Sequence, residues 1–142
     1  MRKEKTISLY LEKFGIRPSV QRIAIAEYLM KHRTHPTADE IFAALYSQIP
    51  TLSKTTVYNT LKLFAESGVA TMLVIDEKNI RFDGETKPHA HLKCKKCGKI
   101  MDVMGCRLPR YRRKDFCVLE TQVFFLGFCE ECMSSINHNI NN

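Results

Sequence analysis

The sequence predicts an α+β fold, in which a helical N-terminal part ends in a two-stranded ribbon and a smaller, strand-rich part follows. Up to residue 66, apolar residues recur at helical spacing in segments that Gly and Pro residues separate. From Val69 the pattern changes to short β-rich runs at 69–75 and 80–83, on either side of a polar turn. Helices followed by such a ribbon are typical of a winged helix-turn-helix.

The four expected helices begin at residues 6, 19, 37 and 53. Ser19 and Ser53 are good N-cap residues, and Thr37 with Glu40 has the spacing of a capping box. The last helix should run to about residue 66, with Gly68 as its stop. The apolar stripe expected to be buried on this last helix consists of Val57, Leu61 and Phe64.

The C-terminal part is expected to be smaller and richer in strands. Strands are expected at 91–93, 99–103 and 116–128, a helical turn at 108–114, a final helix from 130 to about 136, and a frayed polar tail at 137–142. A length of 142 residues suits one large domain or two small ones. We expect domains at 1–84 and 89–142, joined by a hinge at 85–88.

The chain is basic, with a formal net charge of +7. Residues 1–62 hold ten Lys and Arg against five Asp and Glu, and such a surplus attracts phosphate groups. The sequence has no apolar run near the ~20 residues that span a bilayer, and no secretory leader pattern. We therefore expect a cytoplasmic protein without a membrane partner.

Two C-x-x-C pairs, Cys94 with Cys97 and Cys129 with Cys132, predict a structural zinc site. Four thiolates at ~2.3 Å complete a closed tetrahedral centre, which leaves no position for a catalytic water. A reducing compartment disfavours disulfides as an explanation for these cysteines. For Cys106 and Cys117 we expect packing or surface positions, and a redox role stays open.

Three histidines and two aspartates are candidate ligands of a second metal ion: His35, Asp83, His89, His91 and Asp102. Neutral imidazoles with two carboxylates carry a charge of −2, which a divalent cation cancels. Such mixed N/O ligands suit Fe(II), Mn(II), Co(II), Ni(II) or Zn(II). From composition alone, scattered His and Asp are more often surface or capping residues.

Five motifs in order resemble the ferric uptake regulator (Fur) family over about residues 6–135. They lie at residues 17–22, 35–41, 53–61, 89–94 and 129–132. The resemblance implies an N-terminal winged helix-turn-helix followed by a small α/β dimerisation domain. It also implies a homodimer, a structural Zn(II), and a regulatory Fe(II) or Mn(II) on the five His and Asp residues.

The pattern is most similar to the peroxide-responsive branch of that family. Asp102 stands where iron-sensing members tend to carry Glu, and Asn59 where they usually carry Arg. Two features depart from the family pattern. The stretch between Asp102 and Phe116 is short, and Thr121 replaces a His of an additional metal site, which we therefore do not expect.

The resemblance implies a metal-dependent DNA-binding transcriptional repressor that senses peroxide. The helix at 53–66 should enter the major groove. The expected DNA contacts are Arg17, Arg22, Lys54, Thr55, Tyr58 and Asn59. Tyr58 and Asn59 suit thymine methyls and adenine edges, and hence an AT-rich, palindromic operator.

Three alternatives stay open. The nearest is an iron-responsive repressor of the ferric uptake type with the same fold. A remote alternative is a metal-dependent hydrolase, which needs a metal-bound water and a base, but the sequence has no H-E-x-x-H motif, so we do not expect an enzyme. The third is a zinc-ribbon interaction module that binds no DNA.

Overall fold

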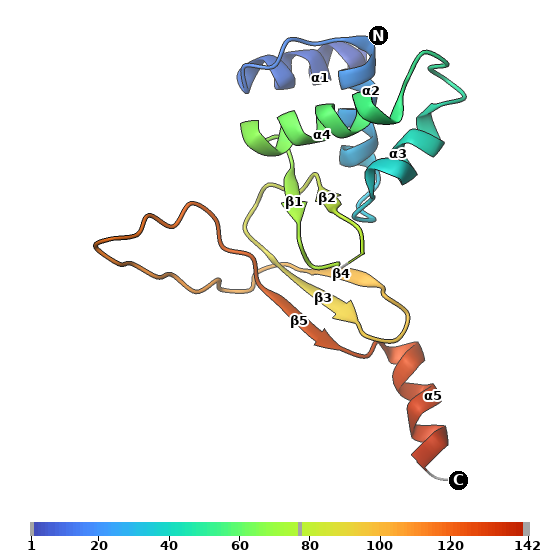
Figure 1. Cartoon of the computed structure of the whole chain (residues 1–142), viewed down its shortest axis with the longest axis vertical. Coiled ribbons are helices and arrows are strands. Elements are labelled where there is room, and N and C mark those ends of the chain that lie inside the picture. The colour runs from blue at the N-terminus through green and yellow to red at the C-terminus, as the bar shows by residue number, and fades with distance from the viewer. Residues whose placement is uncertain (1, 77, 141–142) are drawn as a thin grey trace. The chain divides into compact units, whose positions relative to one another are not determined.

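A computed structural model of the chain describes residues 2–76 and 78–140, and the side chains of the last helix only as far as residue 136. The chain divides into two compact units, Met1–Thr86 and Lys87–Asn142. Figure 1 shows helices and strands in both units, and the predicted α+β class is confirmed. The hinge expected at 85–88 stays a prediction.

The N-terminal unit contains the four expected helices. They are α1 (Arg2–Lys13), α2 (Val20–Lys31), α3 (Ala38–Leu45) and α4 (Lys54–Ser67). The side chains of Ser19 and Ser53 accept hydrogen bonds from backbone N–H groups in the first turns of α2 and α4. Thr37 and Glu40 form the complete capping box, and Gly68 ends α4 with φ 86°. Local capping signals thus fix where α2, α3 and α4 begin and where α4 ends, whereas α1 begins at Arg2, before the expected residue 6.

The core of the N-terminal unit lies where these helices pack together. Val57, Leu61 and Phe64 of α4 are fully buried, as the sequence predicted. Val20 is apolar but 73% exposed. Val20 is the first residue of α2, where a side chain can project beyond the packed face.

A two-stranded ribbon completes the N-terminal unit. Strands β1 (Thr71–Leu73) and β2 (Arg81–Asp83) pair antiparallel, with Thr71 opposite Asp83. Both strands are shorter than the sequence indicated. The ribbon follows α4 directly, as a winged helix-turn-helix requires.

The C-terminal unit is a three-stranded sheet followed by helix α5 (Glu130–Ile140). The strands are β3 (Ala90–Cys94), β4 (Ile100–Val103) and β5 (Phe124–Gly127), in the order β4-β3-β5. Strand β3 pairs antiparallel with β4 and parallel with β5. Strand β5 is therefore an edge strand, and its Phe124, Phe125 and Leu126 are 40–56% exposed.

The segment between β4 and β5 differs from the expectation. The helical turn expected at 108–114 is absent, and only 124–127 of the expected strand 116–128 pairs with another strand. An isolated bridge between Arg113 and Phe116 is the one piece of pairing within the described residues 104–123. Figure 1 shows this segment as a long loop that extends away from the sheet.

The final helix reaches Ile140, beyond the expected end near 136, so residues 137–140 of the expected frayed tail are helical. Residues 141 and 142 of that tail lie outside the described residues. Within the part of the chain that the structure describes, every helix is too short or too polar to cross a bilayer.

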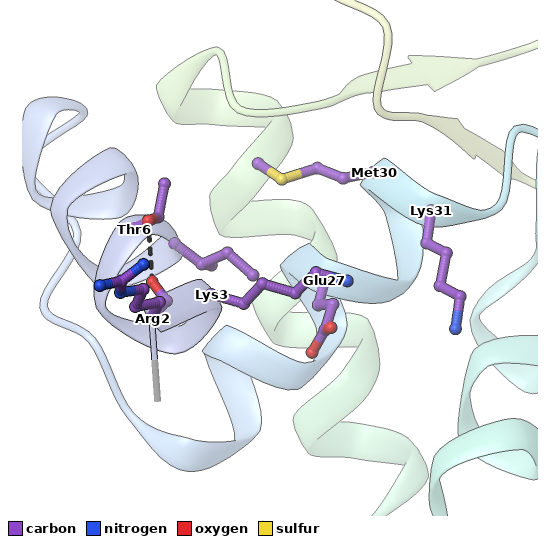
Figure 2. A pocket seen from close by; sticks show the side chains of 7 residues that line it. Arg2, Lys3, Thr6, Glu27, Met30 and Lys31 are labelled. Atoms are coloured by element: carbon purple, nitrogen blue, oxygen red, sulfur yellow. Dashed lines mark hydrogen bonds between the residues drawn. The ribbon is translucent and has the colours of Figure 1, made fainter.

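An open groove of about 460 Å³ lies between α1 and α2 (Figure 2). It is lined by Arg2, Lys3, Thr6, Ile7, Glu27, Met30 and Lys31. Among these residues Glu27 is the only carboxylate, and neither His nor Cys is present. The groove therefore offers no set of metal ligands, and the candidate sites lie elsewhere.

Candidate metal centres and DNA-contacting surface

The four cysteines of the two C-x-x-C pairs converge in the C-terminal unit. The sulfur atoms of Cys94, Cys97, Cys129 and Cys132 all lie within 4.8 Å of one another. Cys97 Sγ and Cys129 Sγ are 3.7 Å apart, much farther than the ~2.05 Å of a disulfide. Thiolates at ~2.3 Å from a tetrahedral zinc ion lie about 3.8 Å from one another. The spacing therefore fits a zinc site and excludes a disulfide between these two residues.

Three local features position the thiols. Cys94 ends β3, and Gly98, with φ 77°, closes the turn after it by donating its N–H to the Cys94 carbonyl. Cys129 precedes α5, and Cys132 lies in the first turn of that helix. The Cys129 N–H donates to Cys94 Sγ at 3.4 Å. A strand end and a helix start thus present two thiols each to the same point.

The protein alone stabilises only part of the negative charge that four thiolates would carry. Hydrogen bonds from backbone N–H groups of Cys97 and Cys129 lower the pKa of the Cys94 thiol to about 6. The neighbouring Cys129 sulfur and burial raise the pKa of Cys132 to about 12. A cation bound among the sulfurs favours the thiolate form of all four.

A second group of ligand atoms lies on and beside strands β3 and β4, and the register of these strands brings it together. His91 of β3 and Asp102 of β4 are directly opposite one another in the antiparallel pair. His89 precedes His91 by two residues, so both imidazoles lie on one face. Asp102 Oδ1 is 3.2 Å from His89 Nε2 and 3.3 Å from His91 Nε2, and the two Nε2 atoms are 3.1 Å apart.

These three atoms have the separations of ligands around a metal ion. Donors at ~2.1 Å from one ion lie about 3.0–3.4 Å from each other in octahedral or tetrahedral geometry. His89 Nδ1 lies 2.7 Å from the Lys87 carbonyl oxygen, to which it can donate its proton. That bond leaves Nε2 as the lone-pair atom that faces His91 and Asp102. Sequence reasoning missed this carbonyl because any residue type supplies one.

The N-terminal unit holds the other two candidate ligands. His35 Nε2 is 3.5 Å from Asp83 Oδ2, and both side chains are 2% exposed. His35 lies in the loop before α3, and Asp83 ends β2. A buried imidazole beside a buried carboxylate is a donor pair that a cation would also stabilise.

Backbone contacts fix the unusual conformation of His35. Its φ is +54°, which is rare for residues other than Gly. The Arg81 guanidinium donates to the His35 carbonyl at 3.1 Å, and the Phe82 N–H donates to the Pro36 carbonyl at 3.0 Å. Arg81 is itself held by Asp76 at 3.0 Å. Arg81 and Phe82 of the ribbon therefore orient His35. The sequence did not indicate this role for Arg81.

Gly84 brings the Asp83 backbone close to α2. A Cβ at position 84 would lie 2.9 Å from the carbonyl oxygen of Leu29, which is closer than real Cβ contacts. The Glu85 N–H then donates to Asp83 Oδ1 at 2.8 Å. The other oxygen, Oδ2, faces His35. A side chain at position 84 would displace this arrangement.

The expected base-contacting residues are exposed on α4. Lys54, Thr55, Tyr58 and Asn59 are all exposed near the N-terminus of this helix, whereas Val57 is buried on the opposite side. Lys54 makes a surface ion pair with Asp39 at 3.7 Å, which adds little stability, and its ammonium lies 5.8 Å from the centroid of the Phe42 ring. These four side chains are accessible to a macromolecular ligand.

A hollow of about 570 Å³ joins α4 to the start of α2. It is lined by Arg17, Pro18, Ser19, Gln21, Arg22, Thr56, Asn59, Thr60 and Leu63. Arg22 is half-buried and donates to the Arg17 carbonyl at 2.8 Å, so it also stabilises the loop before α2. Gln21 and Thr56 were not expected here, because their residue types carry no specific signal. The hollow is suited to a polar, anionic group.

Comparison with known proteins supports one family. The model of the ferric uptake regulator family matches residues 13–120. The chain is 39% identical over 127 residues to the peroxide-responsive repressor PerR of Staphylococcus aureus, covering 86% of each protein. It is 38% identical over 132 residues to PerR of Staphylococcus epidermidis, covering 89% of this chain and 88% of that protein.

Solved structures show the same fold. The Helicobacter pylori ferric uptake regulator Fur aligns with a TM-score of 0.68 at 19% identity, covering 92% of this chain and 93% of that one. PerR of Streptococcus pyogenes aligns with a TM-score of 0.52 at 25% identity, covering 92% of each. Proteins of this family bind DNA as dimers. The chain belongs to the ferric uptake regulator family and is a metal-dependent transcriptional repressor rather than an enzyme.

Proposed function

We propose that this repressor responds to peroxide through a regulatory Fe(II) or Mn(II), and that it binds an AT-rich, palindromic operator in the cytoplasm as a homodimer. The regulatory ion would be held by His35, Asp83, His89, His91 and Asp102. A structural Zn(II) would be held by Cys94, Cys97, Cys129 and Cys132.

The observation that carries the proposal is the trio of His89 Nε2, His91 Nε2 and Asp102 Oδ1, mutually 3.1–3.3 Å apart. When His89 donates its Nδ1 proton to the Lys87 carbonyl, its Nε2 lone pair faces the Asp102 carboxylate oxygen at 3.2 Å, and two acceptors cannot hydrogen-bond to one another. A divalent cation would satisfy all three atoms together. The residues present therefore fit the metal that the family implies.

The proposed ligands are divided between the two units. The C-terminal unit offers two nitrogens and one carboxylate, and the N-terminal unit offers the buried pair of His35 and Asp83. Three neutral imidazoles and two carboxylates would leave a divalent site neutral. An ion that binds both sets at once favours the arrangement of units in which they meet, and shifts the population toward it.

This arrangement would set the spacing of the two α4 helices in the dimer. A helix-turn-helix dimer reads two half-sites whose separation matches the distance between its recognition helices. Tyr58 and Asn59 are exposed where α4 would face base edges, while Arg17 and Arg22 would contact phosphates. The bound ion would thus control the affinity of the dimer for a palindromic operator, although the ion itself does not contact DNA.

Two residues favour peroxide as the signal. Asp102 and Asn59 match the peroxide-responsive branch, and the staphylococcal relatives at 38–39% identity are named peroxide-responsive repressors. An Fe(II) held by these five residues would supply the electrons that reduce peroxide. His35 and His89 are the side chains that we expect to be oxidised, with loss of their ligand function.

The test of the metal site compares His35→Ala with His32→Ala. His32 is exposed and lies three residues away, so it is a matched control. In His35→Ala, metal-dependent binding to operator DNA should be lost while zinc content stays at the wild-type value. His32→Ala should keep both. Metal-dependent DNA binding that survives in His35→Ala would overturn the proposed ligand set.

The test of the signal compares the Fe(II) and Mn(II) forms after peroxide treatment. The iron form should release DNA and gain one oxygen on His35 or His89, measured by peptide mass spectrometry. The manganese form should do neither. Release that depends only on iron supply, with no added oxygen, would assign the protein to the iron-responsive repressors instead.

A further inference from the structure

The loop between β4 and β5 carries a concentrated positive charge that neither metal site uses. We name residues 107–114 the basic segment; its cations are Arg107, Arg110, Arg112, Arg113 and Lys114, all exposed. The C-terminal unit contains ten Lys and Arg against five Asp and Glu, so the five cations of the basic segment equal its entire surplus. The N-terminal unit is closer to neutral, with twelve Lys and Arg against ten Asp and Glu.

Only one of these five cations has an anionic partner among the described residues. Arg113 forms a bidentate pair with Asp115, at 2.6 and 3.1 Å. The other four make no hydrogen bond or ion pair within the described part of the chain. Four like charges within eight residues repel one another, so the segment stores an unfavourable energy that a polyanion would relieve.

The backbone presents this charge away from the sheet. Residues 104–123 form neither helix nor strand, and both ends of the loop are anchored in strands that flank β3. At about 3.3–3.6 Å per residue, the middle of a loop this long can lie up to about 30 Å from its anchors. The basic segment begins three residues into the loop and reaches its middle, and the loop extends from the sheet in Figure 1.

We propose that the basic segment is a second DNA-contacting element, which binds phosphates of the duplex without reading its sequence. Four of its five cations are Arg, whose planar guanidinium matches phosphate geometry in bidentate fashion. Tyr111, 68% exposed between them, adds a hydroxyl that can donate to a phosphate oxygen. Duplex DNA offers one negative charge per ~1.7 Å of axis, which suits closely spaced cations.

This inference rests on the proposed DNA-binding function but adds a sequence-independent contribution from the C-terminal unit. Each phosphate contact releases condensed counterions and steepens the dependence of log K on log[salt] by ~0.9. The basic segment therefore predicts a measurable share of that slope. The share should be equal for operator DNA and for a scrambled duplex.

The experiment uses the full-length protein loaded with zinc and Mn(II). The neutralised variant is R107Q/R110Q/R112Q/K114Q, which leaves the Arg113–Asp115 pair intact. The matched control is R107K/R110K/R112K, which keeps every charge. Affinity for operator and scrambled duplexes is measured by fluorescence anisotropy over a series of salt concentrations, and zinc content with sedimentation velocity verifies that each variant is folded and assembled.

We expect the neutralised variant to bind both duplexes at least about tenfold more weakly at low salt, with a slope shallower by about two to four. The charge-preserving control should stay within about threefold of the wild type. Equal slopes for the wild type and the neutralised variant would overturn the proposal. So would unchanged DNA binding combined with loss of binding to vesicles that contain anionic phospholipid, because the segment would then recognise a membrane.

Failure of the proposed function has a different signature. A wild-type protein that shows no metal-dependent preference for operator over scrambled DNA would remove the repressor mechanism. The salt slopes of wild type and neutralised variant on the scrambled duplex would still decide whether the basic segment contacts phosphate.

Discussion

The two candidate metal centres differ in how the chain supplies their ligands. The four thiols belong to one unit, and short local turns around Cys94 and Cys129 bring them together. The proposed His and Asp ligands are divided, because His35 and Asp83 belong to the N-terminal unit and the remaining three to the C-terminal unit. A centre within one unit can stabilise a fold, whereas a centre that draws on two can report on their arrangement.

The largest expected effect comes from breaking the thiol centre with Cys97→Ser. Structural zinc sites contribute ~10–16 kcal/mol of apparent binding free energy, and the C-terminal unit has few other buried side chains. We expect zinc content to fall to zero and the C-terminal unit to unfold, which far-UV circular dichroism and sedimentation velocity would detect. Cys117→Ser, at an exposed cysteine outside the cluster, is the control and should keep zinc. A folded, zinc-free Cys97→Ser protein would remove the distinction between the two centres.

The second prediction is that Asp102→Ala leaves the fold intact but removes the regulatory ion. Asp102 lies within 3.3 Å of both imidazoles, so its loss deprives the trio of its only charge. Mn(II) affinity should fall by about 100-fold or more. Mutating a residue that only hydrogen-bonds to a metal ligand already lowers metal affinity by about 10–100-fold. Calorimetric titration measures the affinity, and zinc content should not change. A wild-type Mn(II) affinity would show that Asp102 is not a ligand.

Gly84→Ala should have an intermediate effect on stability and on Mn(II) affinity, because it moves the backbone next to the proposed ligand Asp83. The new Cβ would meet the Leu29 carbonyl at 2.9 Å, so the chain beside Asp83 must move. Such overpacking costs ~1–3 kcal/mol of unfolding free energy, and Mn(II) affinity should weaken with it. Gly127→Ala is the matched control, because a Cβ there has no atom within 4 Å. Equal denaturation midpoints for the two variants would contradict the close approach.

The smallest effect is expected for Arg81→Gln. This change removes the donor to the His35 carbonyl and the partner of Asp76, but leaves all five proposed ligands in place. We expect Mn(II) affinity to weaken severalfold and the unfolding free energy to fall by about 1 kcal/mol. Arg33→Gln, which removes the ion pair of an exposed Arg33 with Glu85, should leave the affinity unchanged. An equal loss in both variants would mean that ion pairing in general, rather than the orientation of His35, matters.

Local signals in the sequence predicted the N-terminal unit well. Ser19, Thr37 with Glu40, and Ser53 mark helix starts through bonds that each residue makes within its own first turn. The two C-x-x-C pairs were equally informative, because four thiols in matched pairs have few other uses. Such features depend on neighbours in the chain, so the sequence contains the required information.

The errors lie where structure depends on distant partners. The β-rich run at 116–128 forms a strand only at 124–127, where β3 is available for pairing. The expected turn of helix at 108–114 is absent, and its adjacent cations repel one another while Pro109 lacks an N–H. The register that places His91 opposite Asp102, and the positive φ of His35, likewise arise from contacts between strands and loops.

In a dimer that covers it, the apolar outer edge of β5 would link folding of the protomer to its assembly. An edge strand with unpaired backbone groups and exposed Phe124, Phe125 and Leu126 is prone to associate with another chain. A protomer whose fold is completed only by a second copy has a stability that rises with protein concentration. The amount of repressor synthesised would then determine how much of it persists, before any signal reaches the metal.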